Sequence, residues 1–300
     1  MSLATCLAEL EDEDAPLSYS NLIELSDLVS AEMPQFIVAW NQVSSERRVQ
    51  VVERLVELAE ENARLDFTSI LKIALADDDH QVQEKAIAGM WEGEDRAVIP
   101  LLLNILDSDA PSHVRASAAG ALGRFASLAQ EDKLLPKDAQ LVQDSLMRSL
   151  QDDNDALEVR RRALEAVSHF DTPRIHDYIR WAYGSGEERL KTSSIYAMGK
   201  TQETAWLPAI ISELRNGNPS LRYEAACACG ELGEEDVVHH LIPLLEDDDT
   251  QVQMAAVSAM ANIGGPLAKR ALRHCLRNCD DAIKEAVQEA LEEMDFELEL

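Results

Sequence analysis

The chain has 300 residues, and its 27 lysines and arginines against 56 aspartates and glutamates give a net charge of −29. This charge argues against a broad electrostatic surface for nucleic acid or an anionic membrane, because both are polyanions. Apolar residues make up 46% of the sequence, enough for a large core. No apolar run approaches the roughly 18 residues of a membrane span, and we expect no signal peptide. Five cysteines indicate free thiols, so we predict a cytoplasmic protein without membrane contact.

The segment before residue 66 divides into two parts. Residues 1–17 are rich in aspartate and glutamate, and we predict that they are disordered. Within residues 18–65, the stretch from Glu46 to Ala59 has apolar residues at helical spacing and lacks glycine and proline. We predict that residues 18–65 form a helical cap over the repeats that follow.

A repeat of about 31 residues occupies positions 66–293. Each repeat has an apolar anchor residue. The residues four and seven positions after the anchor are mostly small, and the residue eight positions after it is large. The anchors are Val82, Val114, Val159, Leu190, Leu221, Val252 and Ile283. Offsets 0, 4, 7 and 8 lie on one face of a helix, and a second apolar segment and a polar turn precede each anchor. The pattern predicts helical hairpins that bury their apolar faces by stacking, which is an all-α solenoid of about seven repeats.

One interval between anchors is longer than the others. Val114 and Val159 are 45 residues apart, whereas the other steps are 31 or 32 residues. We expect the surplus to form a surface loop near 126–138. Residues 294–300 form an acidic tail with interspersed leucine and phenylalanine.

These columns resemble the HEAT-repeat family in its short form, which is named after phycobilisome lyases. The resemblance covers about residues 66–293, and it implies that the second helices line a concave surface. HEAT-type repeats often carry an aspartate and, six residues later, an arginine that form a ladder between repeats. Asp109 and Arg115 keep both residues of this pair. The resemblance specifies the fold, whereas the same scaffold serves many functions.

The sequence can be searched for the residues that enzymes of similar architecture require. Deoxyhypusine hydroxylases bind two irons through His-Glu dipeptides, and none of the seven histidines in this chain is followed by glutamate. Phycobilin lyases share the repeat type, but no residue pattern here marks a bilin pocket. HEAT-like DNA glycosylases use a basic groove, which the acidity of the chain disfavours. We therefore expect a protein that is not an enzyme.

We predict no metal site, no cofactor and no catalytic residue. One set of residues has the side chains of a metal site but lacks CxxC or HxxxH spacing. It comprises His239, His240, His274, Cys275 and Cys279. Cysteines at repeat positions that usually hold small or buried residues are expected to act as small apolar side chains of the core.

Offsets 2, 6 and 9–10 of the second helices lie beside the core face, and we predict a binding surface there. Exposed aromatic rings with methionine and arginine nearby are typical of protein recognition, and Tyr196 and Tyr223 fall one repeat apart. The predicted binding residues are Trp91, Arg161, His169, Tyr196, Lys200, Tyr223 and Met254. The alternative is that these side chains only pack against adjacent helices.

Residues 159–200 carry eight basic, five acidic and five aromatic side chains in an otherwise acidic chain. Basic residues among aromatic ones are a composition typical of recognition surfaces, including those for nucleic acid. The alternative explanation is that they are ladder and core residues.

The sequence favours a non-enzymatic scaffold that binds a protein partner along the concave surface, where acidic rims steer a basic segment inward. Two alternatives stay open. One is a lyase-like or chaperone-like subunit that binds a small ligand in the same groove. The other, which the negative charge of the chain disfavours, is nucleic-acid binding by residues 159–200.

Overall fold

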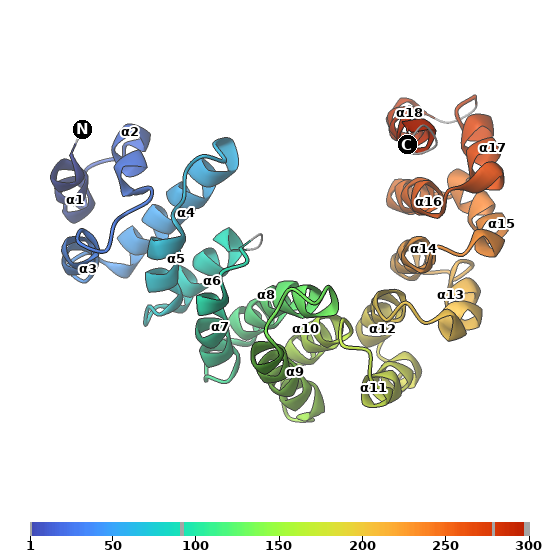
Figure 1. Cartoon of the computed structure of the whole chain (residues 1–300), viewed down its shortest axis with the longest axis horizontal. Helices are drawn as coiled ribbons and strands as arrows, with labels where there is room; N and C mark the ends of the chain where they lie inside the picture. The colour runs from blue at the N-terminus through green and yellow to red at the C-terminus, as the bar shows by residue number, and fades with distance from the viewer. Residues whose placement is uncertain (1, 91–92, 278–279, 297–300) are drawn as a thin grey trace. The chain divides into compact units, whose positions relative to one another are not determined.

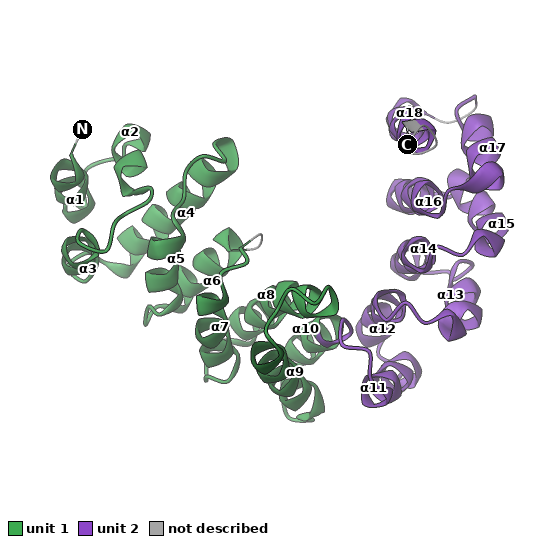
Figure 2. Cartoon of the chain, in the orientation of Figure 1, with its two compact units in different colours: residues 1–166 green, residues 167–300 purple. Residues whose placement is uncertain are grey.

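Figure 1 shows the computed structural model, which describes residues 2–90, 93–277 and 280–296. Every regular element in these ranges is helical. Among these helices, none has both the length and the apolar character that a bilayer crossing requires. The chain divides into two compact units, unit 1 (Met1–Ala166) and unit 2 (Val167–Leu300), which Figure 2 colours separately.

The described residues contain the seven predicted helical hairpins, which confirms the all-α solenoid. In unit 2, the first helices of the hairpins form one layer and the second helices form another (Figure 1). The first helices are α5 (Thr68–Leu75), α7 (Ile99–Leu106), α9 (Pro136–Gln151), α11 (Pro173–Gly184), α13 (Leu207–Glu213), α15 (Val238–Leu241), which continues into η5 (Ile242–Glu246), and α17 (Gly265–Cys275). The second helices are α6 (His80–Gly89), α8 (Ser112–Gln130), α10 (Leu157–Val167), α12 (Glu188–Lys200), α14 (Pro219–Leu232), α16 (Thr250–Ile263) and α18 (Asp281–Phe296). Short 3-10 turns lead into three first helices: η2 (Arg96–Val98), η3 (Thr204–Trp206) and η4 (Glu235–Val237).

Polar turn residues start several of the second helices. Asp79 accepts hydrogen bonds from the backbone N–H groups of Gln81, at 2.8 Å, and Val82, at 3.4 Å. Asp249 caps α16 in the same way and accepts from the N–H of Gln251 at 2.9 Å. A cap of this kind stabilises a helix by about 1 kcal/mol, because it satisfies N–H groups that have no partner within the helix. The aspartate-rich turns of the sequence therefore fix where these helices begin.

Small residues bring neighbouring second helices of unit 2 close together. A Cβ atom added to Gly199 in α12 would lie 2.9 Å from the Cα of Ala228 in α14. A Cβ atom added to Gly230 would lie 2.8 Å from the Cα of Ala259 in α16. The first helices contact one another far less. Because the second-helix layer is the more tightly packed, the array in unit 2 curves toward it, and we call the solvent side of α12, α14, α16 and α18 the inner face.

These close approaches predict opposite effects for glycine substitutions. Gly230→Ala should lower the free energy of unfolding by about 1–3 kcal/mol, because the added methyl group overpacks the contact with α16. Gly120→Ala should raise it by about 0.5–1 kcal/mol, because no atom lies within 4 Å of the added Cβ and alanine is the better helix former. Urea unfolding of both variants checks this pair. A loss of stability in Gly120→Ala or a gain in Gly230→Ala would contradict the packing described.

The structure differs from the disorder predicted for residues 1–17. It contains helix α1 (Leu3–Glu11), with Cys6, Leu7 and Leu10 buried. The apolar residues of this short segment share one helical face, which the acidic composition obscures.

A buried arginine holds α1 in place. Arg47 in α4 (Ser45–Glu61) is 3% exposed. Its guanidinium donates to the backbone oxygens of Glu9 at 2.9 Å, Leu10 at 3.4 Å and Asp12 at 3.0 Å. These carbonyls lie at the C-terminal end of α1, where helix geometry leaves them without partners and where a cation opposes the helix dipole favourably.

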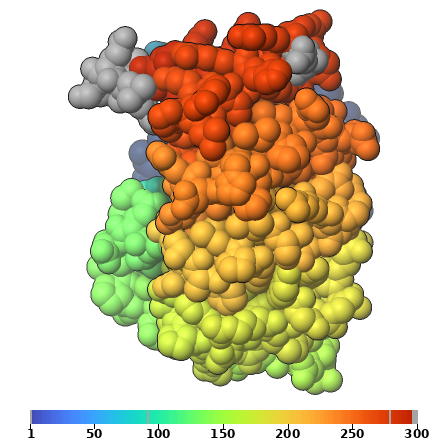
Figure 3. All heavy atoms as spheres, turned by 90° about the vertical axis from the view of Figure 1, so that its right-hand side faces the viewer, coloured from blue at the N-terminus to red at the C-terminus, as the bar shows by residue number. Residues whose placement is uncertain are grey.

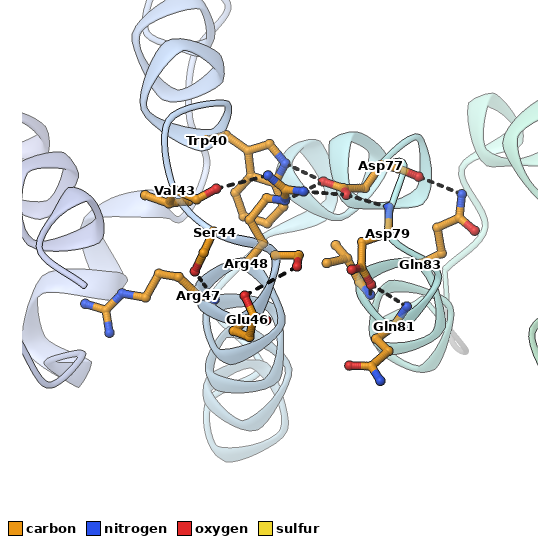
Figure 4. Close-up of polar contacts among 12 residues, drawn as sticks. Trp40, Val43, Ser44, Glu46, Arg47, Arg48, Asp77, Asp79, Gln81 and Gln83 are labelled. Carbon is orange, nitrogen blue, oxygen red and sulfur yellow. Dashed lines mark hydrogen bonds and ion pairs between the residues drawn. The ribbon is translucent and has the colours of Figure 1, made fainter. Parts of the chain in front are cut away.

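Before the repeats lie α2 (Tyr19–Leu22), η1 (Ile23–Leu25) and α3 (Met33–Trp40), which packs against α1, and they are followed by α4, a further second helix that the repeat pattern did not predict. Helix α4 packs against α6, as second helices do in the repeats. The side chain of Arg48 contacts Asp77 in the following repeat at 2.9 Å, and the indole N–H of Trp40 donates to the same carboxylate at 2.9 Å (Figure 4). The anchor column of α4 holds Arg47, where the other repeats have an apolar residue, and this difference hides α4 from the repeat pattern.

The ladder runs from the basic residue after the anchor to a carboxylate of the next repeat. Arg115 donates two hydrogen bonds to Asp155, at 2.8 and 2.7 Å, and Asp155 belongs to the next repeat. Arg222 makes the same paired contact with Asp247, at 2.7 Å for both bonds. Two-pronged contacts of this kind are among the stronger charge-assisted hydrogen bonds.

The Arg222–Asp247 contact predicts a pH effect. The hydrogen bonds from Arg222 lower the pKa of Asp247. The folded-state pKa of Asp247 lies below the unfolded value of about 3.9. The ionised carboxylate therefore contributes fully to the free energy of unfolding above that pH, and this contribution disappears as the pH falls through the folded-state pKa. Asp247→Asn should therefore reduce the free energy of unfolding by about 1–3 kcal/mol at pH 7, and by much less at pH 3. The exposed neighbour Asp248 supplies the control, and a loss in Asp248→Asn equal to that in Asp247→Asn would contradict this role.

The surplus residues between the second and third repeats lengthen two helices and do not form the predicted loop. Helix α8 continues to Gln130 and α9 starts at Pro136, so only a short connection separates them. Leu128 and Leu134 are buried, whereas Leu135 is 45% exposed. The apolar side chains in this segment extend the core of unit 1, which the polar residues around them conceal in the sequence.

Candidate binding surface

Four of the predicted binding residues lie together on the second helices of unit 2. Tyr196 and Lys200 are on α12, Tyr223 is on α14 and Met254 is on α16. Tyr223 is 37% exposed and Met254 is 38% exposed, whereas Tyr196 and Lys200 are half-buried. We call these four residues the inner strip. Large side chains at this exposure are available to a partner without being needed for the core.

Two contacts organise one end of the inner strip. The ammonium group of Lys200 lies 2.5 Å from a carboxylate oxygen of Glu231 on α14. The same group lies 5.5 Å from the centre of the Tyr196 ring. Lys200 therefore holds two adjacent second helices together, and Glu231 compensates its charge.

A hollow of about 380 Å³ lies beside Tyr223, near the N-terminal ends of α14 and α16. Its walls include the carboxylates of Glu224 and Asp249 together with the ring of Tyr223. We call this cavity the Tyr223 hollow. An aromatic ring next to two carboxylates attracts a lysine or arginine side chain, because both the ring face and the carboxylates favour a cation.

The Tyr223 hydroxyl and the Cys227 thiol stay neutral at physiological pH. Burial, and then the negative charge of Glu224, raises the pKa of Cys227 to about 11. The neighbouring Cys227, and then partial burial, raises the pKa of Tyr223. A thiol with so high a pKa is a poor nucleophile.

Acidic side chains surround the inner face of unit 2 at both ends of its helices. They come from the turns before α16 and α18 and from the segments after α12 and α14. The exposed members are Glu203, Glu234, Glu235, Asp236, Asp248 and Asp281. This distribution produces a negative potential around a partly apolar strip, which favours an approaching basic segment.

The other three predicted residues lie elsewhere. Trp91 lies outside the described residues. Arg161 belongs to unit 1, where it pairs with Glu158 at 3.0 Å and Glu165 at 2.8 Å. His169 lies in the connection between α10 and α11.

Sequence reasoning missed the two carboxylates of the Tyr223 hollow. Asp249 belongs to one of the polar turns that precede the anchors, and its carboxylate also caps α16. Glu224 follows Tyr223 directly, outside the offsets used for the predicted surface. A search for acidic residues adjacent to the exposed aromatic column could have identified both.

The basic side chains of residues 159–200 largely contact acidic groups. Arg160 pairs with Asp153 at 2.9 Å, and Arg180 pairs with Asp177 at 2.9 Å. The ammonium group of Lys191 lies 2.8 Å from a carboxylate oxygen of the buried Glu213. These charges are compensated within the protein, which reduces their effect on a nucleic-acid backbone.

Histidine and cysteine residues do not converge on a metal site within the described ranges, where no group of three or more metal-ligating side chains is found. The rings of His239 and His240 contact each other, with their centres 3.8 Å apart. Cys279, which the sequence analysis grouped with these histidines, lies outside the described residues.

Comparisons with known proteins agree with this architecture. The model of the family described as HEAT repeats matches residues 68–157 and 207–292, which together are more than half of the chain. No curated protein matches the sequence.

Solved structures show the same fold at low sequence identity. The complex of CpcE and CpcF of phycocyanin lyase from Nostoc sp. PCC7120 is 15% identical with a TM-score of 0.56, covering 94% of this chain and 97% of that chain. Importin beta is 14% identical with a TM-score of 0.53, covering 97% of this chain and 44% of that chain. A mutant of Kap121p is 15% identical with a TM-score of 0.53, covering 97% of this chain and 37% of that chain. The repeat columns, the stacked hairpins and the family match lead to one conclusion: this chain belongs to the HEAT-repeat proteins.

Proposed function

We propose that the chain is a non-enzymatic interaction scaffold, and that the inner strip of unit 2 binds a basic segment of a protein partner. The Tyr223 hollow carries this proposal, because an exposed ring and two carboxylates line a cavity of about 380 Å³. A lysine or arginine of the partner would enter the hollow, and apolar partner side chains would contact Met254. Aromatic residues near the centre of an interface contribute a large share of the binding energy.

Electrostatics supports a basic partner in this proposal. The chain carries a net charge of −29, and the exposed rim residues of unit 2 add negative potential close to the inner strip. Complementary charge accelerates association and disfavours acidic competitors. Nucleic acid is disfavoured by the same potential and by the ion pairs within residues 159–200.

The named relatives fit an interaction role. One similar structure is a complex of two chains of phycocyanin lyase, and others are importin beta and Kap121p. At 14–15% identity, this likeness supports a shared fold. The partner itself is to be identified by experiment. We also propose a reducing, cytoplasmic location, since Cys6, Cys227 and Cys229 form no disulfide.

The test selects random 12-residue displayed peptides on the immobilised chain and compares it with the Tyr196→Ala, Tyr223→Ala double variant. We expect enriched peptides that contain lysine or arginine next to apolar residues. Their affinity for the double variant should fall about tenfold or more, as expected when aromatic anchors are lost. The melting temperature should change by only a few degrees, because Tyr223 is exposed and Tyr196 is half-buried.

A matched variant separates the inner face from the outer layer. Trp181 on α11 is an aromatic residue of similar exposure, at 42%. Trp181→Ala should leave the affinity for these peptides within about threefold. If the double tyrosine variant retained full affinity while Trp181→Ala lost it, the proposed site would be wrong.

A further inference from the structure

A second cavity lies in the other helical layer of unit 2. It is a groove of about 500 Å³ between η5 and α17, on the side of the molecule that Figure 3 shows. Leu245 and Ala271 contribute to its apolar lining. Ile242 and Leu267 also line it, at 38% and 39% exposed. Exposed aliphatic side chains that face one another across a groove are typical of a surface that a partner covers.

The helix on one side of this groove has an unusual charge. Helix α17 (Gly265–Cys275) contains three arginines and lysines and one histidine, with no acidic residue, although the whole chain carries a net charge of −29. Lys269 pairs with Asp295 of α18, and the guanidinium of Arg273 lies 3.9 Å from the same carboxylate. Arg270 and His274, in contrast, line the groove. The basic side chains of α17 therefore divide into a pair that faces α18 and a pair beside the groove.

Two carboxylates also line the groove, at the end where η5 finishes and α18 begins. They are Glu246 and Asp280. Asp280 accepts a hydrogen bond from the backbone N–H of Ile283 at 3.0 Å, so it caps α18 and its charge faces the positive end of that helix. Arg270 lies one helical turn before His274, away from this end. The middle of the groove is thus apolar, and among the described residues Arg270 is the one arginine that lines it, on the α17 side.

We propose that this groove binds a short acidic segment of a second protein partner. Two apolar side chains of that segment would contact Ile242, Leu245 and Leu267, and an aspartate or glutamate between them would pair with Arg270. An arginine and a carboxylate can form two parallel hydrogen bonds, which adds geometric specificity to the apolar contacts. The two layers of unit 2 would then bind partners of opposite charge, and the chain would act as an adaptor between them.

The test uses random 12-residue displayed peptides selected on the full chain, followed by measurement of peptide affinities by fluorescence anisotropy. We expect a class of peptides rich in aspartate or glutamate and in leucine, isoleucine or phenylalanine. Arg270→Glu should weaken the binding of this class at least tenfold. Arg273→Glu makes the same charge change on the same helix but faces Asp295, so it should weaken binding less than threefold.

Two further variants keep this result distinct from the inner strip. Leu267→Ser should weaken the acidic peptides, whereas Tyr196→Ala with Tyr223→Ala should leave their affinity unchanged. Circular dichroism melts of each variant verify that the chain is folded. The proposal is overturned if no acidic class is enriched, or if Arg270→Glu and Arg273→Glu weaken it equally, which would indicate only a general charge effect.

Discussion

Replacing Ala225 with aspartate is expected to lower the free energy of unfolding by about 3 kcal/mol or more. Ala225 lies on α14 with no exposed surface, between the neighbouring second helices α12 and α16. A carboxylate introduced there would be shielded from water and would lack a cationic partner. Burial should raise the pKa of the new aspartate above its unfolded value, so the destabilisation should grow as the pH rises from 4 to 7. Urea unfolding at both pH values measures this.

The damage from Ala225→Asp should also stay local. Each repeat contacts mainly its neighbours, so hydrogen exchange should accelerate in α12, α14 and α16 and change little in α5 to α8. Ser258→Asp, at an exposed position of α16, introduces the same charge and should change stability by less than about 0.5 kcal/mol. An equally small loss in Ala225→Asp would show that the offset-four column is not buried.

Leu134→Ala should lower the free energy of unfolding by about 2–4 kcal/mol. Leu134 lies in the short connection between α8 and α9 and is 7% exposed, so its truncation leaves a cavity in the core of unit 1. The adjacent Leu135 is 45% exposed, and Leu135→Ala should change the stability by less than about 0.5 kcal/mol. Thermal and urea unfolding of the two variants give the comparison.

This pair decides how the surplus residues of unit 1 are used. If they formed a surface loop, the two leucine variants would behave alike and both would be close to the parent protein. The buried Leu134 predicts a clear difference between them. Deletion of the surplus should for the same reason lower the stability of unit 1.

Local periodicity was enough to predict the repeats because each second helix repeats the same chemistry. Ala225 at offset four and Ala228 at offset seven mark the side of α14 that neighbouring helices approach. The small size of Gly199 and Gly230 has the same cause, since each lies against an alanine of the next repeat. Because similar repeats make similar contacts, the pattern can be recognised from the amino-acid sequence alone.

Helix α4 could not be recognised in this way, because the residue in its anchor column makes polar contacts in place of apolar ones. Arg47 occupies the anchor column, and it is buried because it donates to carbonyl oxygens of α1. Those acceptors lie more than 30 residues away in the sequence and are backbone atoms, so no residue type indicates them. The same long-range contact explains why the acidic N-terminal segment forms a helix.

The candidate site was predicted in part for a similar reason. Tyr223 and Met254 share one column of adjacent second helices, so the period places them together. The carboxylates of the Tyr223 hollow come from different offsets, since Glu224 lies on α14 and Asp249 caps α16. Such a combination depends on how the ends of neighbouring helices align, which the three-dimensional structure shows and the period does not.

Site-specific photo-crosslinking identifies the helical layer of unit 2 that a bound basic peptide touches. A benzophenone amino acid is placed at Met254 on the inner face, or at Ile242 on the outer layer, in two otherwise identical proteins. Each is irradiated with the basic peptide that binds most tightly after selection. The account predicts a crosslink from position 254, lost when Tyr196→Ala and Tyr223→Ala are added, and none from position 242. Crosslinking of that peptide from position 242 and not from 254 would contradict the claim that the inner strip of unit 2 is the binding surface.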